Sequence, residues 1–272
     1  MAGSADQASR APVVVLATGY SGAERLRSLL DRLPDLACTS GTGIVPLCEQ
    51  AATVWRNAEG RPEGPPSRLA AASTRALADS IITTMLAREG KRRWYEVCSA
   101  IPEVAETFAR LYPGTRFVCL YRSWGGFLRA VFDASPWGMS DPAFVPFTRA
   151  YPASNVATLT AYWTAHTASL LAFERSHPSA ILRVRFEDLA AAGSQTAQAV
   201  LSFLGAAGPG SDTASFQDNL ARPQPAAPRA ETGLLARPEL DLPANLIPPA
   251  MLTQANDLLR QLDYPALPLP GR

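Results

Sequence analysis

The chain has 272 residues, of which 47% are hydrophobic and 18% charged, so it can bury a sizeable core and is not a disordered polymer. Its 25 basic and 24 acidic side chains nearly cancel, which argues against a dedicated nucleic-acid-binding protein. No apolar run is long enough to span a bilayer, and the 4 cysteines are scattered without metal-ligand spacing. We therefore expect a soluble, cytoplasmic protein with no membrane segment and no metal site.

The N-terminal region has the pattern of a parallel α/β protein. Residues 1–12 are small and polar, and we expect them to be flexible. Residues 13–17 (VVVLA) form a continuous apolar run, as in a strand that is buried on both faces. The segment TGYSG then favours a tight turn, and the leucines of ERLRSLLDRL recur on one helical face. The chain is thus predicted to open with a strand, a tight loop and a helix.

The middle of the chain repeats this alternation. A short strand and a Gly/Ser/Thr loop are expected in 36–46, and further strands at 94–98 and 115–121. Helices are expected near 46–57, over 68–89 with Gly90 as the C-cap, over 102–111, and from SWGGFLRAVF.

The C-terminal half is less regular. Residues 134–154 contain four prolines and are expected to form a long irregular excursion of the kind that often covers a substrate. A helix at 155–176, a strand at 180–186, a helix at 195–204 and a last helix at 249–262 are expected around the Pro/Gly-rich stretch 205–249. Strands that alternate with helices predict one α/β domain over 13–264 with a mainly parallel sheet, followed by a tail at 265–272.

The loop after the first predicted strand is a candidate anion site. Backbone N–H groups point outward where a parallel strand ends and a helix begins, and the helix N-terminus adds partial positive charge. Gly19 and Gly22 permit close approach, and Ser21 offers a hydroxyl. The loop lacks the Lys-Ser/Thr of a P-loop and the spacing of G-x-G-x-x-G, so a purely structural turn is the alternative.

Two later features join this loop. Arg122 ends the strand FVCLY, where ligands of open α/β sheets bind, and can pair bidentately with a phosphate. The acidic pair Glu187 and Asp188 begins a helix after RVRF and can fix the site from behind. The alternatives are a solvated surface arginine and a purely structural acidic pair.

These three elements, in this order, resemble the nucleotide-dependent sulfotransferase superfamily. ATGYSGAERLRSLLDRLPDL is similar to the family's 5′-phosphosulfate loop and helix, G-x-P-R-S-G-T-T-L-L-R-x-L-L-D-x-H-P-D. YPGTRFVCLYRSWGGFLRA resembles the family's 3′-phosphate element, and RVRFEDL resembles R-Y-E-D-L. The continuation CTSGTGIVP is most similar to the tyrosylprotein-sulfotransferase branch and its bacterial relatives. The likeness extends over about 13–264.

The resemblance implies a P-loop-like, three-layer α/β/α fold and a donor, 3′-phosphoadenosine 5′-phosphosulfate (PAPS), that leaves as the bisphosphate PAP. The implied nucleotide site consists of loop residues and two positions after the 115–121 strand: Gly19, Tyr20, Ser21, Gly22, Ala23, Glu24, Arg25, Arg122 and Ala130.

The departures from the family pattern fall on the cations around the transferring sulfuryl group, on the base and on the 3′-phosphate element. Tyr20 stands where the family has Lys or Arg, and Val97 replaces the Lys of W-x-E-K. Ala23 and Glu24 replace a Thr/Ser pair, and Ala130 replaces the 3′-phosphate Ser. The stretch CTSGT, at 38–42, lacks the base Glu of C-G-E-E-T.

Sulfuryl transfer resembles phosphoryl transfer in needing cations and N–H donors around the developing charge. The sequence offers Tyr20 as a neutral donor and Arg25, Arg27, Arg92 and Arg93 as replacement cations. Its candidate bases are Glu24, Glu49, Glu96 and His166, although a lone His on a helix and a Glu on a solvated face are more often structural.

Two hypotheses follow from these residues. The first is a divergent sulfotransferase that acts on a hydroxyl of a small molecule in specialised metabolism, with Trp137, Phe144, Phe147 and Tyr151 covering the acceptor. The second is a sulfotransferase-like protein without sulfuryl transfer, which binds a nucleotide or metabolite or serves an active subunit, or a transferase of another chemistry on the same fold. The sequence leaves open whether the chain acts alone, as a homodimer or with a heteromeric partner.

Overall fold

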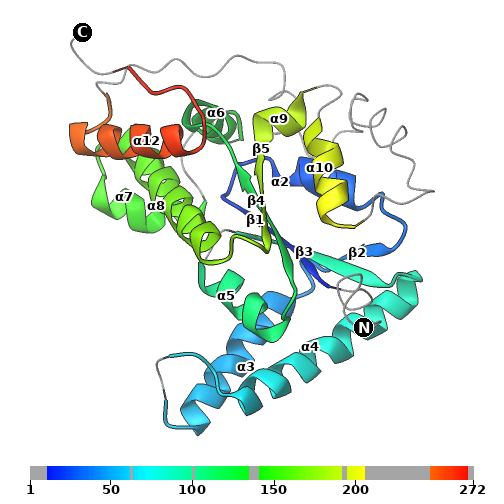
Figure 1. The fold of residues 1–272 in the computed structure, drawn as a ribbon. Coiled ribbons are helices and arrows are strands. Elements are labelled where there is room, and N and C mark those ends of the chain that lie inside the picture. Colours follow the sequence, from blue (N-terminus) through cyan, green and yellow to red (C-terminus); the bar gives the residue numbers. More distant parts are fainter. Residues whose placement is uncertain are drawn as a thin grey trace.

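A computed structural model describes residues 11–61, 64–99, 102–134, 141–191, 195–205 and 246–268. Its centre is a five-stranded sheet of order β2-β3-β1-β4-β5 in which every neighbouring pair is parallel (Figure 1). The strands are β1 (Val13–Ala17), β2 (Leu36–Cys38), β3 (Arg93–Ser99), β4 (Arg116–Tyr121) and β5 (Ile181–Arg185). Because all five are parallel, their carboxyl ends share one edge of the sheet.

Helices cover both faces of this sheet. They are α2 (Ala23–Leu30), α3 (Ile44–Ala58), α4 (Arg68–Glu89), α5 (Pro102–Leu111), α6 (Trp124–Ala134), η1 (Pro142–Phe144), α7 (Val145–Ala150), α8 (Asn155–Ser176), α9 (Phe186–Ala190), α10 (Gln195–Phe203) and α12 (Pro249–Gln261). The predicted α/β fold with a mainly parallel sheet and helical layers on both faces is confirmed.

The alternation of β1 side chains between two cores explains its continuous apolar run. Val14 and Leu16 pack in the core under α3, α4, α5, α6, α8 and α12. Val13 and Val15 pack in the opposite core, under α2 and α10. All four side chains are at most 1% exposed, so no position of this strand can be polar.

Most helix boundaries follow local signals in the sequence. The Ser67 side chain accepts the Ala70 N–H at 3.1 Å at the start of α4, and Gly90 ends that helix with a left-handed φ of 65°. Ser154 begins α8 in the same way, accepting the Ala157 N–H at 3.1 Å. Neither of these two long helices, nor any other described helix, has an apolar stretch that could cross a membrane.

The excursion expected at 134–154 is more ordered than predicted. Its described part holds η1 and α7 before α8 begins. The Asp141 carboxylate caps η1 by accepting the Ala143 N–H at 2.9 Å, and prolines in a first helical turn are compatible with helix because that turn needs no N–H donor. The prediction of irregular structure from these prolines is therefore wrong for residues 142–150. Trp137, most of 205–249 and residues 1–10 and 269–272 lie outside the described residues.

Candidate functional site

The loop after β1 is a tight turn whose polar groups partly bond one another. The Ser21 hydroxyl donates to the Thr18 C=O at 2.6 Å, and the Ser21 N–H approaches the same oxygen at 3.2 Å. Tyr20 has a φ of 63°, in the left-handed region that few residues other than glycine adopt. Ser21 is fully buried, so its hydroxyl proton serves the loop instead of pointing outward.

The start of α2 retains the amides that an anion could use. Gly22, with a φ of 84°, is the N-cap residue, and the first hydrogen bond of the helix runs from the Arg25 N–H to the Gly22 C=O at 3.0 Å. The amides of Ala23 and Glu24 precede that bond, as the first amides of any helix do. The exposed Glu24 carboxylate lies 3.9 Å from the Arg27 guanidinium, which offsets its charge beside this N-terminus.

Arg122 brings the second element of the site against this loop. β4 is the neighbour of β1, with Leu120 in register with Ala17, so the two strands end side by side. The Arg122 side chain is only 6% exposed. Its Nη1 donates to the Tyr20 C=O at 3.0 Å, and its guanidinium carbon lies 4.1 Å from the centre of the Phe186 ring. A buried cation thus lies directly beside the loop.

The segment around Glu187 braces Arg122 from behind. One Glu187 oxygen accepts the Ser123 N–H at 3.0 Å, and the other accepts the Tyr264 hydroxyl at 2.5 Å. The backbone of α6 comes close at Gly126, where an added Cβ would lie 2.8 Å from the Ser123 Oγ and 3.1 Å from the Arg122 Nε. Glu187 thus has the bracing contacts that the sequence suggested for the acidic pair, whereas the Asp188 carboxylate lies 3.5 Å from the Arg185 guanidinium.

Phe186 also supports the loop from below. A Cβ at Gly22 would lie 2.2 Å from a carbon of the Phe186 ring, so only glycine fits there. The ring therefore touches the turn on one side and the Arg122 guanidinium on the other. Ala130, one turn beyond Gly126 on α6, is buried and has no hydroxyl with which to bind a phosphate.

Tyr20 packs into an aromatic cluster that we define as Tyr20, Phe127, Phe144, Phe147, Tyr162 and His166. Its ring stacks on Phe144 with centroids 5.7 Å apart and meets the edge of Phe127 at 6.4 Å. Its hydroxyl hydrogen-bonds the Asp141 carboxylate. Burial, together with the negative Asp141, raises the pKa of Tyr20 to about 12, so Tyr20 is a neutral donor at physiological pH.

Gly19 joins the loop to α8. Its N–H donates to the Tyr162 hydroxyl at 3.2 Å. The family pattern quoted above has Pro at this position, and proline has no N–H, so this hydrogen bond requires a residue other than proline. A Cβ on Gly19 would lie 3.0 Å from the same hydroxyl oxygen. A larger residue at position 19 would therefore crowd the Tyr162 hydroxyl.

His166 lies one helical turn after Tyr162. Its Nδ1 is 2.9 Å from the Tyr162 C=O, and its ring lies 4.1 Å from the Tyr162 ring. Because a carbonyl only accepts, Nδ1 carries a proton in this contact, and in that tautomer the lone pair lies on Nε2. His166 is thus joined to the loop through Tyr162, whose ring it contacts and whose hydroxyl accepts the Gly19 N–H.

Glu96 occupies a different place. Its side chain is 4% exposed, and its carboxylate accepts the Thr39 hydroxyl at 2.6 Å. Burial raises the pKa of Glu96, an effect that hydrogen bonds from Thr39 and Ser40 partly offset. It is in register with Val14, three residues below the end of β1, which puts it about 10 Å from the loop edge. Its described contacts are with the turn after β2.

Two of the four replacement cations proposed from sequence lie away from the loop, and the other two lie on α2. Arg92 and Arg93 precede or begin β3, about 20 Å from the edge where the loop lies, so that prediction is wrong. Arg27 lies between Glu24, at 3.9 Å, and Asp31, at 3.7 Å. Arg25 is half-buried on α2, where burial and then Arg32 lower its pKa. Val97 packs against the α2-side core.

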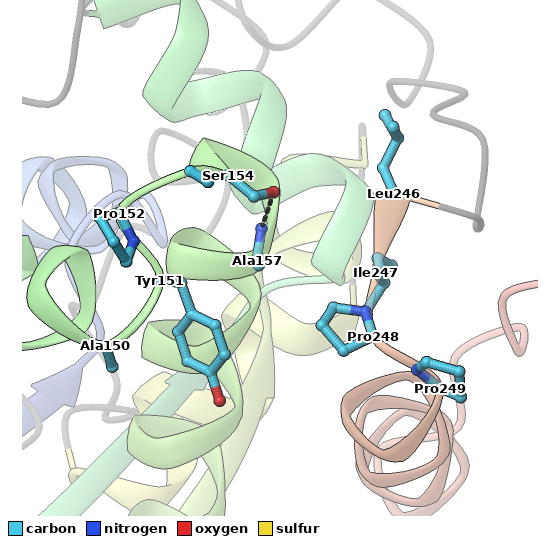
Figure 2. A pocket seen from close by; sticks show the side chains of 10 residues that line it. Ala150, Tyr151, Pro152, Ser154, Ala157, Leu246, Ile247, Pro248 and Pro249 are labelled. Atoms are coloured by element: carbon cyan, nitrogen blue, oxygen red, sulfur yellow. Dashed lines mark hydrogen bonds between the residues drawn. The ribbon is translucent and has the colours of Figure 1, made fainter.

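Glu49 is an exposed residue of α3, and no group of three His, Cys, Asp or Glu side chains among the described residues could hold a metal ion. Figure 2 shows an open, mostly apolar groove of about 470 Å³ between the α7–α8 turn and the start of α12. Tyr151 and Ser154 line one side and Leu246 to Pro249 the other, at the end of α7 remote from Phe144.

The contacts that complete the site were not evident from sequence. Phe186 lies in the RVRFEDL segment, but nothing in that pattern shows that its ring supports a glycine more than 160 positions earlier. Tyr162 lies in a helix whose apolar residues surround it on several sides, so its hydroxyl had no distinguishing signal.

The parallel sheet with helices on both faces defines an α/β protein. At its carboxyl edge, the backbone amides of the first loop and the buried Arg122 form a candidate anion site. A family model described as "Sulfotransferase family" matches residues 12–208, and the chain belongs to that family. No curated protein matches the chain.

Solved structures share the fold at low identity. The sulfotransferase domain from the curacin biosynthetic pathway is similar with a TM-score of 0.55 at 13% identity, over 95% of this chain and 99% of that one. The sulfotransferase domain of the Synechococcus PCC 7002 olefin synthase gives 0.55 at 15% identity, over 95% and 96%. Sulfotransferase STF9 from Mycobacterium avium gives 0.54 at 12% identity, over 97% and 79%.

Proposed function

We propose that the chain binds PAPS and transfers its sulfuryl group to a hydroxyl of a small molecule. The observation that carries this proposal is the contact between the two halves of the site, where Arg122 donates to the Tyr20 C=O at 3.0 Å. One half offers amides at a helix N-terminus and the other a buried guanidinium. Two such donors at one sheet edge suit a nucleotide that carries phosphates at both ends of its ribose.

The residues present fit the nucleotide better than the sulfuryl group. The amides of Ala23 and Glu24 would hold the 5′-phosphosulfate, and Arg122 would hold the 3′-phosphate without help from Ala130. PAPS, when bound, supplies the activated sulfuryl group. In the transfer the acceptor oxygen forms a bond to sulfur, the bond from sulfur to the phosphate oxygen breaks, and PAP leaves. The Nε2 of His166 would accept the acceptor proton.

Calorimetry with PAP tests the nucleotide site. We expect binding, and we expect Arg122→Ala to weaken it by about ten- to a hundredfold, as for loss of a charged hydrogen bond. Arg110→Ala is a matched control, because Arg110 is exposed on α5 and pairs with Glu106 at 3.6 Å. Absence of binding at millimolar PAP contradicts the proposal, and an unchanged affinity in Arg122→Ala contradicts the role of that residue.

The aromatic packing of Tyr20 favours a second candidate function. Tyr20 points toward Phe144 and Asp141, and Val97 packs in an apolar core, so the two family positions that carry sulfuryl-contacting cations hold neutral side chains. A protein with this site could bind the nucleotide, or a metabolite, without transferring sulfate. A single-turnover measurement with sulfur-labelled PAPS separates the two functions. Label transferred to a phenol or alkyl alcohol supports the first, and intact PAPS supports the second.

The biosynthetic role rests on the neighbours in fold. Two similar structures are sulfotransferase domains of the curacin biosynthetic pathway and of an olefin synthase. We propose that this chain likewise acts in specialised metabolism, in the cytoplasm, on an acceptor that lies between His166 and the loop. A panel of phenols and aliphatic alcohols in the transfer assay would identify the acceptor class.

A further inference from the structure

Residues 141–151, which we name the lid, pack on α8. The Phe144 and Phe147 rings lie 4.8 and 5.5 Å from the Tyr162 ring, and the Tyr151 C=O accepts the Thr158 hydroxyl at 3.1 Å. The lid comprises Asp141, η1, α7 and Tyr151. Phe144 is its only described residue that is fully buried, and α7 buries no side chain. The outer end of α7 borders the open groove of about 470 Å³. A segment with so little buried surface opens more readily than the core around it.

Tyr20 supplies the lid's contacts with the loop. Its ring stacks on Phe144 at an angle of 21°, and its hydroxyl hydrogen-bonds Asp141. The Tyr20 C=O also accepts a hydrogen bond from the Arg122 guanidinium at 3.0 Å. One residue in a left-handed backbone conformation thus contacts both the lid and the cation proposed to hold the nucleotide.

We propose that Tyr20 is a positioning residue that couples the nucleotide site to closure of the lid over the acceptor. A ligand that fixes the loop and Arg122 favours the Tyr20 conformation on which Phe144 stacks. A closed lid in turn favours the loop conformation that binds the ligand, and the two effects are equal because coupling between sites is reciprocal. The inference rests on the proposed function for the identity of the ligand, whereas the Tyr20–lid contact can be tested without it.

Hydrogen exchange of the lid amides, measured by mass spectrometry, tests the contact first in the absence of nucleotide. We expect Tyr20→Ala to speed exchange of residues 142–151 by about three- to tenfold, the effect of losing one aromatic pair. Phe144→Leu, which keeps an apolar side chain of similar size, should act in the same direction. Val145→Ala is the control, because Val145 is 46% exposed on the same segment, and it should leave exchange unchanged.

Nucleotide then tests the coupling. Saturating PAP should slow lid exchange by about fivefold or more in the natural protein and have no such effect in Tyr20→Ala, since a coupling of this size is ordinary for linked sites. By reciprocity, Phe144→Leu should weaken PAP binding by no more than the factor by which PAP protects the lid. Val145→Ala should keep the natural affinity.

Two results would overturn the inference. Lid exchange that is unchanged in both Tyr20→Ala and Phe144→Leu would show that the loop does not hold the lid. PAP binding that leaves lid exchange unchanged in the natural protein would show that the two sites are uncoupled. Failure of PAP to bind at all instead contradicts the proposed function, and the measurements without nucleotide still decide whether Tyr20 anchors the lid.

Discussion

The two halves of the site differ in what holds them together. The half after β4 keeps its cation, and Phe186 and Glu187 fix it through a ring contact and a hydrogen bond to the Ser123 amide. The half after β1 has a tyrosine in place of a cation, and that tyrosine packs against other aromatic rings. Contacts that bind a nucleotide need not be the contacts that stabilise the transition state of group transfer. In this chain Arg122 is present although Ala130 replaces the nearby serine of the family pattern, whereas the two positions where that pattern has cations hold Tyr20 and Val97.

Restoring both cations is expected to have the largest effect, and it tests whether their loss limits sulfuryl transfer. Tyr20→Arg combined with Val97→Lys should raise transfer from PAPS to a phenol by about a hundredfold or more, because one preorganised donor contributes about 3–4 kcal/mol in such reactions. Release of PAP in the presence of the phenol measures the gain. Val97→Lys alone, which keeps the aromatic cluster, is the matched variant. If the rate of transfer does not rise although PAP still binds, the missing cations at positions 20 and 97 are not what limits transfer.

Gly22→Ala tests the support that both halves share. The new Cβ would overlap the Phe186 ring at 2.2 Å and add strain at a φ of 84°, so we expect a loss of about 3 kcal/mol in the free energy of unfolding. Gly43→Ala provides the control, since Gly43 is also an N-cap with a φ of 84° but has no atom within 4 Å of the added Cβ.

Urea denaturation measures both glycine variants. Gly43→Ala should lose only about 1 kcal/mol, the strain component alone. Equal losses in the two variants would mean that Phe186 yields easily and does not fix the loop.

Glu96→Gln tests whether the Glu96 carboxylate takes part in sulfuryl transfer or only in the folded structure around Thr39. The glutamine keeps an acceptor for the Thr39 hydroxyl but carries no charge. Burial raises the pKa of Glu96 in the folded state. The free energy of unfolding of the natural protein is therefore highest below the unfolded-state pKa, and it falls as the pH rises through the folded-state pKa.

The variant should therefore match the natural protein near pH 4 and be more stable than it at pH 8, where the buried carboxylate is charged. Thermal unfolding across this pH range is the measurement, with the exposed Glu49→Gln as the control. Abolished transfer with no gain in stability would instead assign Glu96 to the chemistry.

Tyr264→Phe is expected to have the smallest effect. It removes the hydroxyl that donates to Glu187 at 2.5 Å but leaves the Ser123 amide bonded to the same carboxylate. We expect a loss of about 1 kcal/mol in stability and a PAP affinity within about threefold of the natural value. Calorimetry would reveal a larger loss of affinity, and that result would mean that the C-terminal segment helps to bind the nucleotide.

Local patterns were sufficient to predict most of the fold. The apolar run of β1, the Gly90 cap of α4 and the strand before Arg122 each depend on neighbours within a few residues. The segment 141–150 failed this test, because prolines that suit a first helical turn were interpreted as breakers.

The site was only half predictable. The loop and Arg122 were found because the ends of parallel strands meet at one edge. Arg92 and Arg93 were misplaced because closeness in sequence to β3 ignored which end of that strand faces the loop. The Tyr162 hydroxyl on Gly19 joins residues 143 positions apart, and no periodicity or spacing encodes such a contact.

The central position of β1 also affects the way the chain is made. This strand is synthesised before any partner, yet it pairs with β3 and β4, which end only at Ser99 and Tyr121. At translation speeds of about 5–20 residues per second, an apolar pentapeptide with two open edges waits several seconds on the ribosome. Such a strand is a site for mispairing between nascent chains. Holdase chaperones that bind short apolar segments should therefore raise the yield of folded protein during expression.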